Sequence, residues 1–181
     1  MIAICIGHSR KIGSRYDGGA YSPHLGINER DFNLKVATKL SAKLTCRGIP
    51  SKIFDHYEGR GYGSAMADVA AQVKKAGCTV AVELHFNSAT PSATGHEWFH
   101  HPKSTKGKRI AEKFEAVFRR LFPSLKARGC QPRTIRQNGG KFLDYTHCPA
   151  IILEPFFGSN ESDCDSINID TLAEAYANAL S

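Results

Sequence analysis

The stretch VAVELHFNSA, residues 80–89, has the pattern of a buried strand with polar side chains in its middle. Apolar residues alternate along it with Glu83, His85 and Asn87. This period of two points successive side chains to opposite faces of a sheet. One face of the strand is therefore apolar, and the other presents a carboxylate, an imidazole and an amide in a row. A buried strand with such a face calls for a functional explanation.

Other strand-like runs alternate with helical patterns along the chain. The expected strands cover residues 2–7, 51–55, 79–88, 95–101 and 150–157, and the expected helices cover 28–44, a segment through Val69 and Val73 that ends near Gly77, 104–121 and 171–180. This alternation predicts an α/β fold with a central mixed, mostly parallel sheet of about six strands and helices on both sides. A chain of 181 residues fits a single domain.

Charge and composition restrict the classes of function. The net charge of +7 and the pI of about 9.2 favour anionic partners such as a cell wall. The basic residues are scattered, so we expect no specific nucleic-acid site. No segment has the length of a membrane span, and the N-terminus has neither a basic leader nor the apolar segment of a signal peptide. We therefore expect synthesis in the cytoplasm without an export signal.

The six cysteines show no CxxC spacing. A chain made in the cytoplasm usually keeps its thiols reduced. We expect most of the cysteines to be small core residues, and none has the sequence context of a nucleophile.

Polar residues gather where the predicted strands end. His8 follows the first strand, His85 lies near the end of the third, and Glu154 lies in the last. Glu29 opens the first helix on the same stripe as Val36, so we expect it to point toward the sheet. The carboxyl ends of the strands are where α/β proteins place their chemistry. The fold therefore predicts that two histidines and two carboxylates converge.

This set of side chains suits a catalytic zinc ion. Such an ion uses three protein ligands, commonly two imidazoles and one carboxylate, and keeps one position open for water. It lowers the pKa of that water to about 7 and polarises a carbonyl group. A separate carboxylate is needed to take the proton and return it to the leaving group. We expect His8, Glu29 and His85 to be the metal ligands and Glu154 the general acid and base.

Each residue also has a simpler interpretation. A single histidine at a strand end is usually a hydrogen-bonded structural residue, and a carboxylate in a first helical turn is favoured by the helix dipole. Glu154 is harder to explain in this way. It lies in the apolar run IILEPFF, where burying an unpaired carboxylate costs several kcal/mol.

Four motifs in order carry a family resemblance: IGHS (6–9), NE (28–29), ELHFNS (83–88) and IILEPFFGSNESD (151–163). Together they resemble the zinc-dependent N-acetylmuramoyl-L-alanine amidases of the Amidase_3 family, and most of all the catalytic domains of phage endolysins. The resemblance implies that His8, Glu29 and His85 bind Zn²⁺ and that Glu154 is catalytic. It implies cleavage of the amide between the lactyl group of N-acetylmuramic acid and the L-alanine of the stem peptide in bacterial peptidoglycan.

The resemblance covers nearly the whole chain, and it leads to expectations about the domain content, the oligomeric state and the route by which the enzyme reaches the cell wall. Residues 1–181 would form one catalytic domain without a separate cell-wall-binding domain, and we expect a monomer. A phage or prophage enzyme without an export signal would depend on a holin, or on comparable membrane damage, to reach the wall.

The chain departs from many family members at two places. It reads SRKIGSRYDGG after His8, where many have glycines and an aspartate, and ELHFN where many have SIHAN. Glu83 is thus a candidate to orient His85, and Asn87 is expected to line the same groove. His96 and His24 are candidate substrate contacts. Adjacent His100 and His101 point to opposite faces of a strand, so they do not readily bind one metal ion together, and we expect them to be surface residues.

Two alternatives remain open. One is another zinc peptidase or amidohydrolase, such as a carboxypeptidase, which would differ in its products. The other is a non-catalytic cell-wall-binding protein, which would have no need for the buried Glu154.

Overall fold

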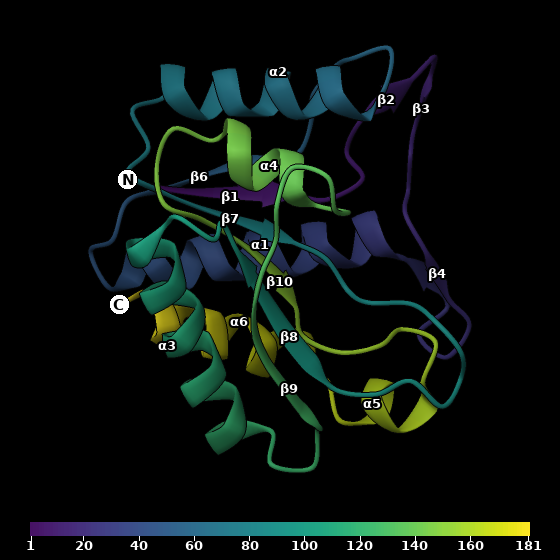
Figure 1. Ribbon diagram of the computed structural model, residues 1–181. Coiled ribbons are helices and arrows are strands. Elements are labelled where there is room, and N and C mark those ends of the chain that lie inside the picture. Colours follow the sequence, from purple (N-terminus) through teal and green to yellow (C-terminus); the bar gives the residue numbers. More distant parts are fainter.

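A six-stranded mixed sheet forms the centre of the computed structural model, which describes residues 1–181 (Figure 1). Its strand order is β6-β1-β7-β10-β8-β9. The strands are β1 (Ile2–Ile6), β6 (Ser51–Phe54), β7 (Val80–Leu84), β8 (His96–His100), β9 (Ala127–Pro132) and β10 (Ala150–Glu154). Strands β6, β1, β7 and β10 are parallel, β8 is antiparallel to β10, and β9 is parallel to β8. The predicted α/β fold is confirmed.

Helices cover both faces of the sheet (Figure 1). Helices α1 (Glu29–Cys46), α3 (Thr105–Leu121) and α6 (Ile169–Leu180) pack on one face and share a core of 27 buried residues. Helices α2 (Tyr62–Lys75) and α4 (Gly140–Tyr145) cover the other face over a core of 15. A short helix, α5 (Glu161–Asp165), follows β10. No helix has the length and hydropathy of a membrane span.

The central strands are buried because their apolar side chains face two cores. In β7, Val82 and Leu84 belong to the larger core, whereas Ala81 belongs to the smaller one. The parallel register aligns the ends of three strands: Ile6 of β1 pairs with Leu84 of β7, and Leu84 with Leu153 of β10. The residues that follow these positions therefore meet at one edge of the sheet.

Two small antiparallel pairs lie between β1 and α1. They are β2 (Lys11–Ile12) with β3 (Arg15–Tyr16), and β4 (Tyr21–Ser22) with β5 (Ile27–Asn28). Asn28 then caps α1, because its side chain accepts a hydrogen bond from the Asp31 N–H at 3.0 Å. This cap makes Glu29 the first helical residue and turns its side chain toward the sheet, where Glu29 is 3% exposed.

Several elements differ from the sequence-based expectations. The small hairpins, β9, α4 and α5 were not predicted, and the third strand ends at Leu84 rather than at residue 88. All six cysteines are free. Cys5, Cys78 and Cys164 are buried, Cys130 and Cys148 are partly buried and Cys46 is exposed, so half of them rather than most are fully buried.

Candidate metal centre

Two histidines and one glutamate meet beyond the ends of β1 and β7. One nitrogen or oxygen atom from each of His8, Glu29 and His85 lies within 4.8 Å of the others. The carboxylate of Glu29 lies between the two rings. Its Oε2 is 3.4 Å from His8 Nε2, and its Oε1 is 2.8 Å from His85 Nδ1. The structure thus brings together the three residues expected to be ligands.

The backbone of His8 adopts a conformation that side chains rarely take. Its φ is +58°, and His8 is the only non-glycine residue with positive φ. Flanking contacts hold the segment in place: the Tyr57 hydroxyl accepts from the Ser9 N–H at 3.0 Å and donates to the Ile6 carbonyl at 3.3 Å. Strained backbone that the surroundings enforce in this way is typical of functional sites.

Two glycines leave room for the histidine rings. A Cβ at Gly7 would lie 2.2 Å from His85 Cε1. A Cβ at Gly19 would lie 2.6 Å from Glu29 Oε2 and 2.7 Å from His8 Cδ2. Gly19 also has a φ of +72°, which favours glycine. The chain therefore packs its backbone directly against the three candidate ligands.

Each histidine has a carboxylate near its other ring nitrogen. Glu83 Oε2 lies 3.2 Å from His85 Nε2, and Asp17 Oδ1 lies 3.4 Å from His8 Nδ1. Glu83 is only 2% exposed. A carboxylate in this position fixes the tautomer and the orientation of a ligating imidazole and increases its basicity. The arrangement leaves Nδ1 of His85 and Nε2 of His8 directed at Glu29.

Opposite charges dominate the electrostatics of this cluster. Burial acts to lower the pKa of His85, but the carboxylates of Glu83 and Glu29 outweigh it and raise that pKa well above its usual value. Burial acts to raise the pKa of Glu29, but its hydrogen bond to His85 and the charges of both histidines lower it below its usual value. The cluster thus favours an ionised Glu29, the form that binds a metal ion.

A cavity of about 430 Å³ opens beside the cluster. His8, Glu83, His85, Asn87 and Glu154 all line it. The Oε2 atom of Glu154 is buried and has no hydrogen-bond partner. Burial raises the pKa of Glu154 to about 8, with His85 opposing this shift and the neighbouring carboxylates adding to it. An unpaired buried carboxyl group is costly and is unusual outside functional sites.

The polar face of β7 continues into a second hydrogen-bonded pair. Asn87 donates through Nδ2 to Glu97 Oε1 at 2.6 Å, and both residues line the cavity. Glu97 lies in β8, and its Oε2 is 3.4 Å from Arg128 Nε in β9. The position of Asn87 in the groove was expected from the sequence, whereas Glu97 was not singled out.

The expectations for the other histidines need correction. His96 is fully buried and does not line the cavity. Its ring packs against Trp98 and Phe118, and its Nδ1 lies 3.2 Å from Glu115 Oε2. The period of two in β8 explains this placement, because Glu97 and Phe99 face the cavity, whereas His96 and Trp98 face α3.

His100 was also placed wrongly by sequence reasoning, and the cavity gives no support for the substrate contact expected of His24. His24 is exposed and lies outside the cavity lining. His100 is buried at 5% exposure rather than at the surface, and His101 is partly buried.

Sequence reasoning missed other residues of the site. Asp17, Tyr57 and Arg133 line the cavity together with Glu97. Asp17 belongs to the segment YDGG, in which an aspartate beside glycines marks a close-packed turn. Tyr57 and Arg133 have no local sequence pattern that would have pointed to the site.

The donor atoms suit a metal ion. Two imidazole nitrogens and one carboxylate, held by packed backbone and oriented by further carboxylates, are ligands typical of catalytic zinc sites. A fourth group, the unpaired Glu154, lies in the adjoining cavity. This fold with such a site is typical of metal-dependent hydrolases.

Comparisons with known proteins identify the family within this class. The family model described as Amidase_3, N-acetylmuramoyl-L-alanine amidase, matches residues 2–181. The chain therefore belongs to this family of peptidoglycan hydrolases. Two distant relatives are each 24% identical: the endolysin of Bacillus phage SPP1, over 99% of this chain and 64% of the relative, and the uncharacterized protein YqiI of Bacillus subtilis, over 86% and 72%.

Solved structures share the fold. An N-acetylmuramoyl-L-alanine amidase from Clostridium difficile 630 has a TM-score of 0.79 at 24% identity, covering 99% of this chain and 93% of the other. The catalytic domain of the CD27L endolysin, which targets Clostridia difficile, also has a TM-score of 0.79, at 20% identity, covering 99% and 95%. These likenesses confirm the architecture independently of the family match.

Proposed function

We propose that the protein is a zinc enzyme that cleaves the amide between the lactyl group of N-acetylmuramic acid and the L-alanine of the stem peptide. Family membership supports the reaction. The metal-binding geometry supports the cofactor, since His8, Glu29 and His85 supply three donor atoms within 4.8 Å of one another. When bound there, zinc supplies Lewis acidity toward the substrate carbonyl and the attacking water.

The observation that most strongly supports the proposed reaction is the unpaired carboxyl group of Glu154. Its buried Oε2 lacks a partner in a cavity that it shares with His8 and His85. In the proposed reaction Glu154 takes a proton from the attacking water and delivers it to the departing L-alanine nitrogen. A pKa of about 8 suits a group that must both accept and donate a proton near neutral pH. A purely binding protein would gain nothing from this buried group.

Glu83 and Asn87 have supporting roles in this proposal. Glu83 holds the ring of His85 through Nε2, so that Nδ1 remains directed at the metal position. Asn87 is fixed by its hydrogen bond to Glu97 and presents a polar wall to the substrate. His96 takes no part, since it lies outside the cavity.

Product analysis on purified peptidoglycan tests the proposed reaction. The amidase releases new amino termini of L-alanine and creates no new reducing sugar ends. A carboxypeptidase-like enzyme would instead release amino acids from the carboxyl end of the stem peptide. A wall-binding protein would sediment with the wall and release nothing. Either of these last two results overturns the proposal.

We also propose that the protein acts as a phage or prophage endolysin, with residues 1–181 as its catalytic domain. The similarity to the SPP1 endolysin supports this role. The proposal includes a monomeric enzyme that reaches the wall after a holin has opened the membrane, drawn to it by its charge of +7. Expression in a bacterial host tests it: lysis should follow only when a holin is produced together with the enzyme, and lysis without a holin would contradict this route.

A further inference from the structure

The charges that line the cavity are unevenly distributed. Asp17, Glu83, Glu97 and Glu154 contribute carboxyl groups, whereas Arg10 and Arg133 are the only arginine or lysine residues of the lining. Such a cavity repels an anionic substrate unless a cation receives the substrate's charge. Apart from His8, His85 and the metal ion proposed to bind them, the two arginines are the cations of the lining that can pair with such a group.

Only one of the two arginines has no ion-pair partner. Arg10 Nη2 lies 3.8 Å from Asp17 Oδ2, so its charge already has a partner. The guanidinium of Arg133 lies over the ring of Phe99, with Cζ 3.8 Å from the ring centroid, and it forms no ion pair. Stacking on an aromatic ring leaves the hydrogen-bonding edge of a guanidinium free for a carboxylate.

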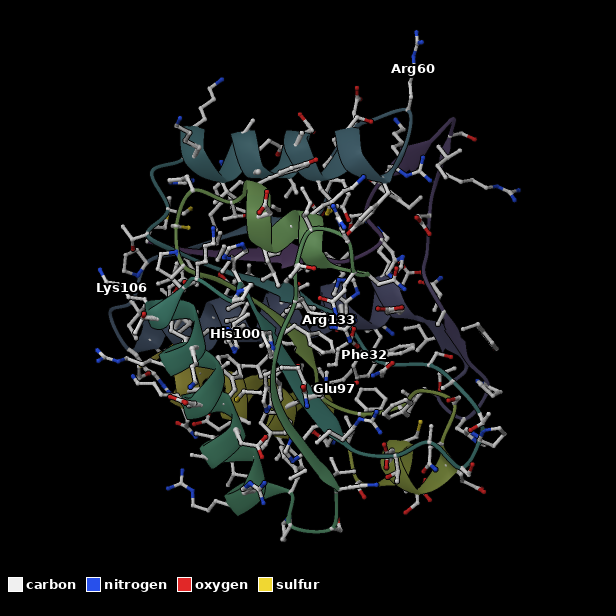
Figure 2. All side chains as sticks on the ribbon, in the orientation of Figure 1. Phe32, Arg60, Glu97, His100, Lys106 and Arg133 are labelled. Carbon is white, nitrogen blue, oxygen red and sulfur yellow. The ribbon has the colours of Figure 1, made fainter.

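The fold holds Arg133 in a defined place. The residue follows the last position of β9, and its backbone N–H donates to the His100 carbonyl at 2.9 Å. Figure 2 shows Arg133 over the middle of the molecule, near β8, whereas Arg60 projects away from the surface. Arg133 is also only partly exposed. A preorganised, partly desolvated arginine binds an anion more strongly than one that is free in water.

The proposed substrate places its charges on one side of the scissile bond. The muramoyl side is neutral near the amide, whereas the stem peptide carries carboxyl groups. The nearest belongs to the residue after L-alanine, which is linked onward through its side-chain carboxyl and so leaves its α-carboxyl free or amidated. This group lies about 7 Å from the scissile amide, at the usual length per residue. Arg133 lines the same cavity as His85 and Glu154, so the carboxylate nearest the scissile amide is the substrate charge that its guanidinium is best placed to meet.

We propose that Arg133 binds the free α-carboxylate of the second stem-peptide residue and makes the enzyme selective for the non-amidated form. This inference rests on the proposed function, because it assigns a subsite for that substrate. Arg133 is here a specificity-determining residue and takes no part in proton transfer. The opposing interpretation is that Arg133 only packs on Phe99.

A pair of soluble N-acetylmuramoyl peptides that differ only in amidation of the second residue tests the inference. The wild type should have a higher kcat/KM for the acid than for the amide. The substitution Arg133→Gln should lower kcat/KM for the acid by about tenfold or more, as expected for a charged hydrogen-bonded pair, and leave the value for the amide nearly unchanged. Arg136→Gln removes an exposed charge from the same loop and is the matched control.

The outcomes separate this inference from the proposed function. Equal losses on both peptides, or no change in the ratio of acid to amide, would overturn the role of Arg133 while leaving the amidase activity in place. A structural defect lowers both rates together and does not shift that ratio. A wild type that cleaves neither these peptides nor peptidoglycan would contradict the proposed function itself.

Discussion

Glu83 Oε2 lies 3.2 Å from Nε2 of His85, on the opposite side of the imidazole from Glu29. This carboxylate is almost fully buried, and its position departs from the SIHAN sequence that many members of the family carry. The contact explains why this chain has a glutamate here, because Glu83 can fix the ring of a proposed metal ligand through the nitrogen that the metal does not use.

The first prediction follows from that contact. Glu83→Leu should weaken zinc binding by about tenfold or more, because His85 loses the group that orients it. Glu83→Gln keeps an acceptor for the Nε2 proton and should retain most of the affinity. Competition with a chelator measures both. Equal affinities for the wild type and the leucine variant would show that Glu83 does not position the ring.

The second prediction concerns the backbone next to the ligands. Gly19→Ala should abolish stoichiometric zinc binding, because its Cβ would lie 2.6 Å from Glu29 Oε2. Gly26→Ala is the matched control: its φ of +64° is similar, but a Cβ there meets nothing within 4 Å. The control should lose only about 1 kcal/mol of stability from backbone strain. Zinc content and thermal melting of the two variants check this, and normal zinc content in Gly19→Ala would contradict the packing argument.

The third prediction concerns stability and pH in metal-free protein. The pKa of Glu154 is raised by burial from 4.5 to about 8, so unfolding favours its ionisation. A raised carboxyl pKa destabilises the fold increasingly as pH rises from 4.5 to about 8, and has no such effect at lower pH.

Glu154→Gln removes this cost. Its Tm should exceed that of the wild type by about 5 °C at pH 8, less than the full pKa shift implies because the cavity admits water. The difference should vanish near pH 4. Thermal melts of chelator-treated proteins across this pH range measure the difference. A difference in Tm that does not change with pH would show that folding does not raise the pKa of Glu154.

The sequence predicts the central strands because their physical signals are local and strong. Strands β7 and β10 are apolar runs between two cores, and their shared register brings His85 and Glu154 to the edge that also holds His8. Strand β9 escaped prediction because ARGCQP is an exposed edge strand with glycine and proline and no alternating pattern. Helix α4 was not predicted because the NGG sequence indicates a turn, and the last glycine of that turn is the first residue of the helix.

The residues of β8 do not reveal which of its side chains face the cavity and which face α3. The segment HEWFH has polar and aromatic side chains on both faces, so its period of two does not reveal which face is buried. The structure places Glu97 in the cavity and His96 under α3, whereas we expected His96 near the substrate groove. Contacts such as those of Tyr57 and Arg133 join segments that are distant in sequence, and no local pattern encodes them.

The proposed proton transfer depends on Glu154, so hydrolysis of peptidoglycan and zinc content should be measured together on the wild type and on Glu154→Gln. We expect the wild type to release L-alanine amino termini with about one zinc ion per chain, as a three-ligand catalytic site requires. The variant should keep its zinc and lose its activity by a factor of about 100 or more, the contribution of a general acid and base. A variant that remains active with its zinc in place would contradict the role of Glu154.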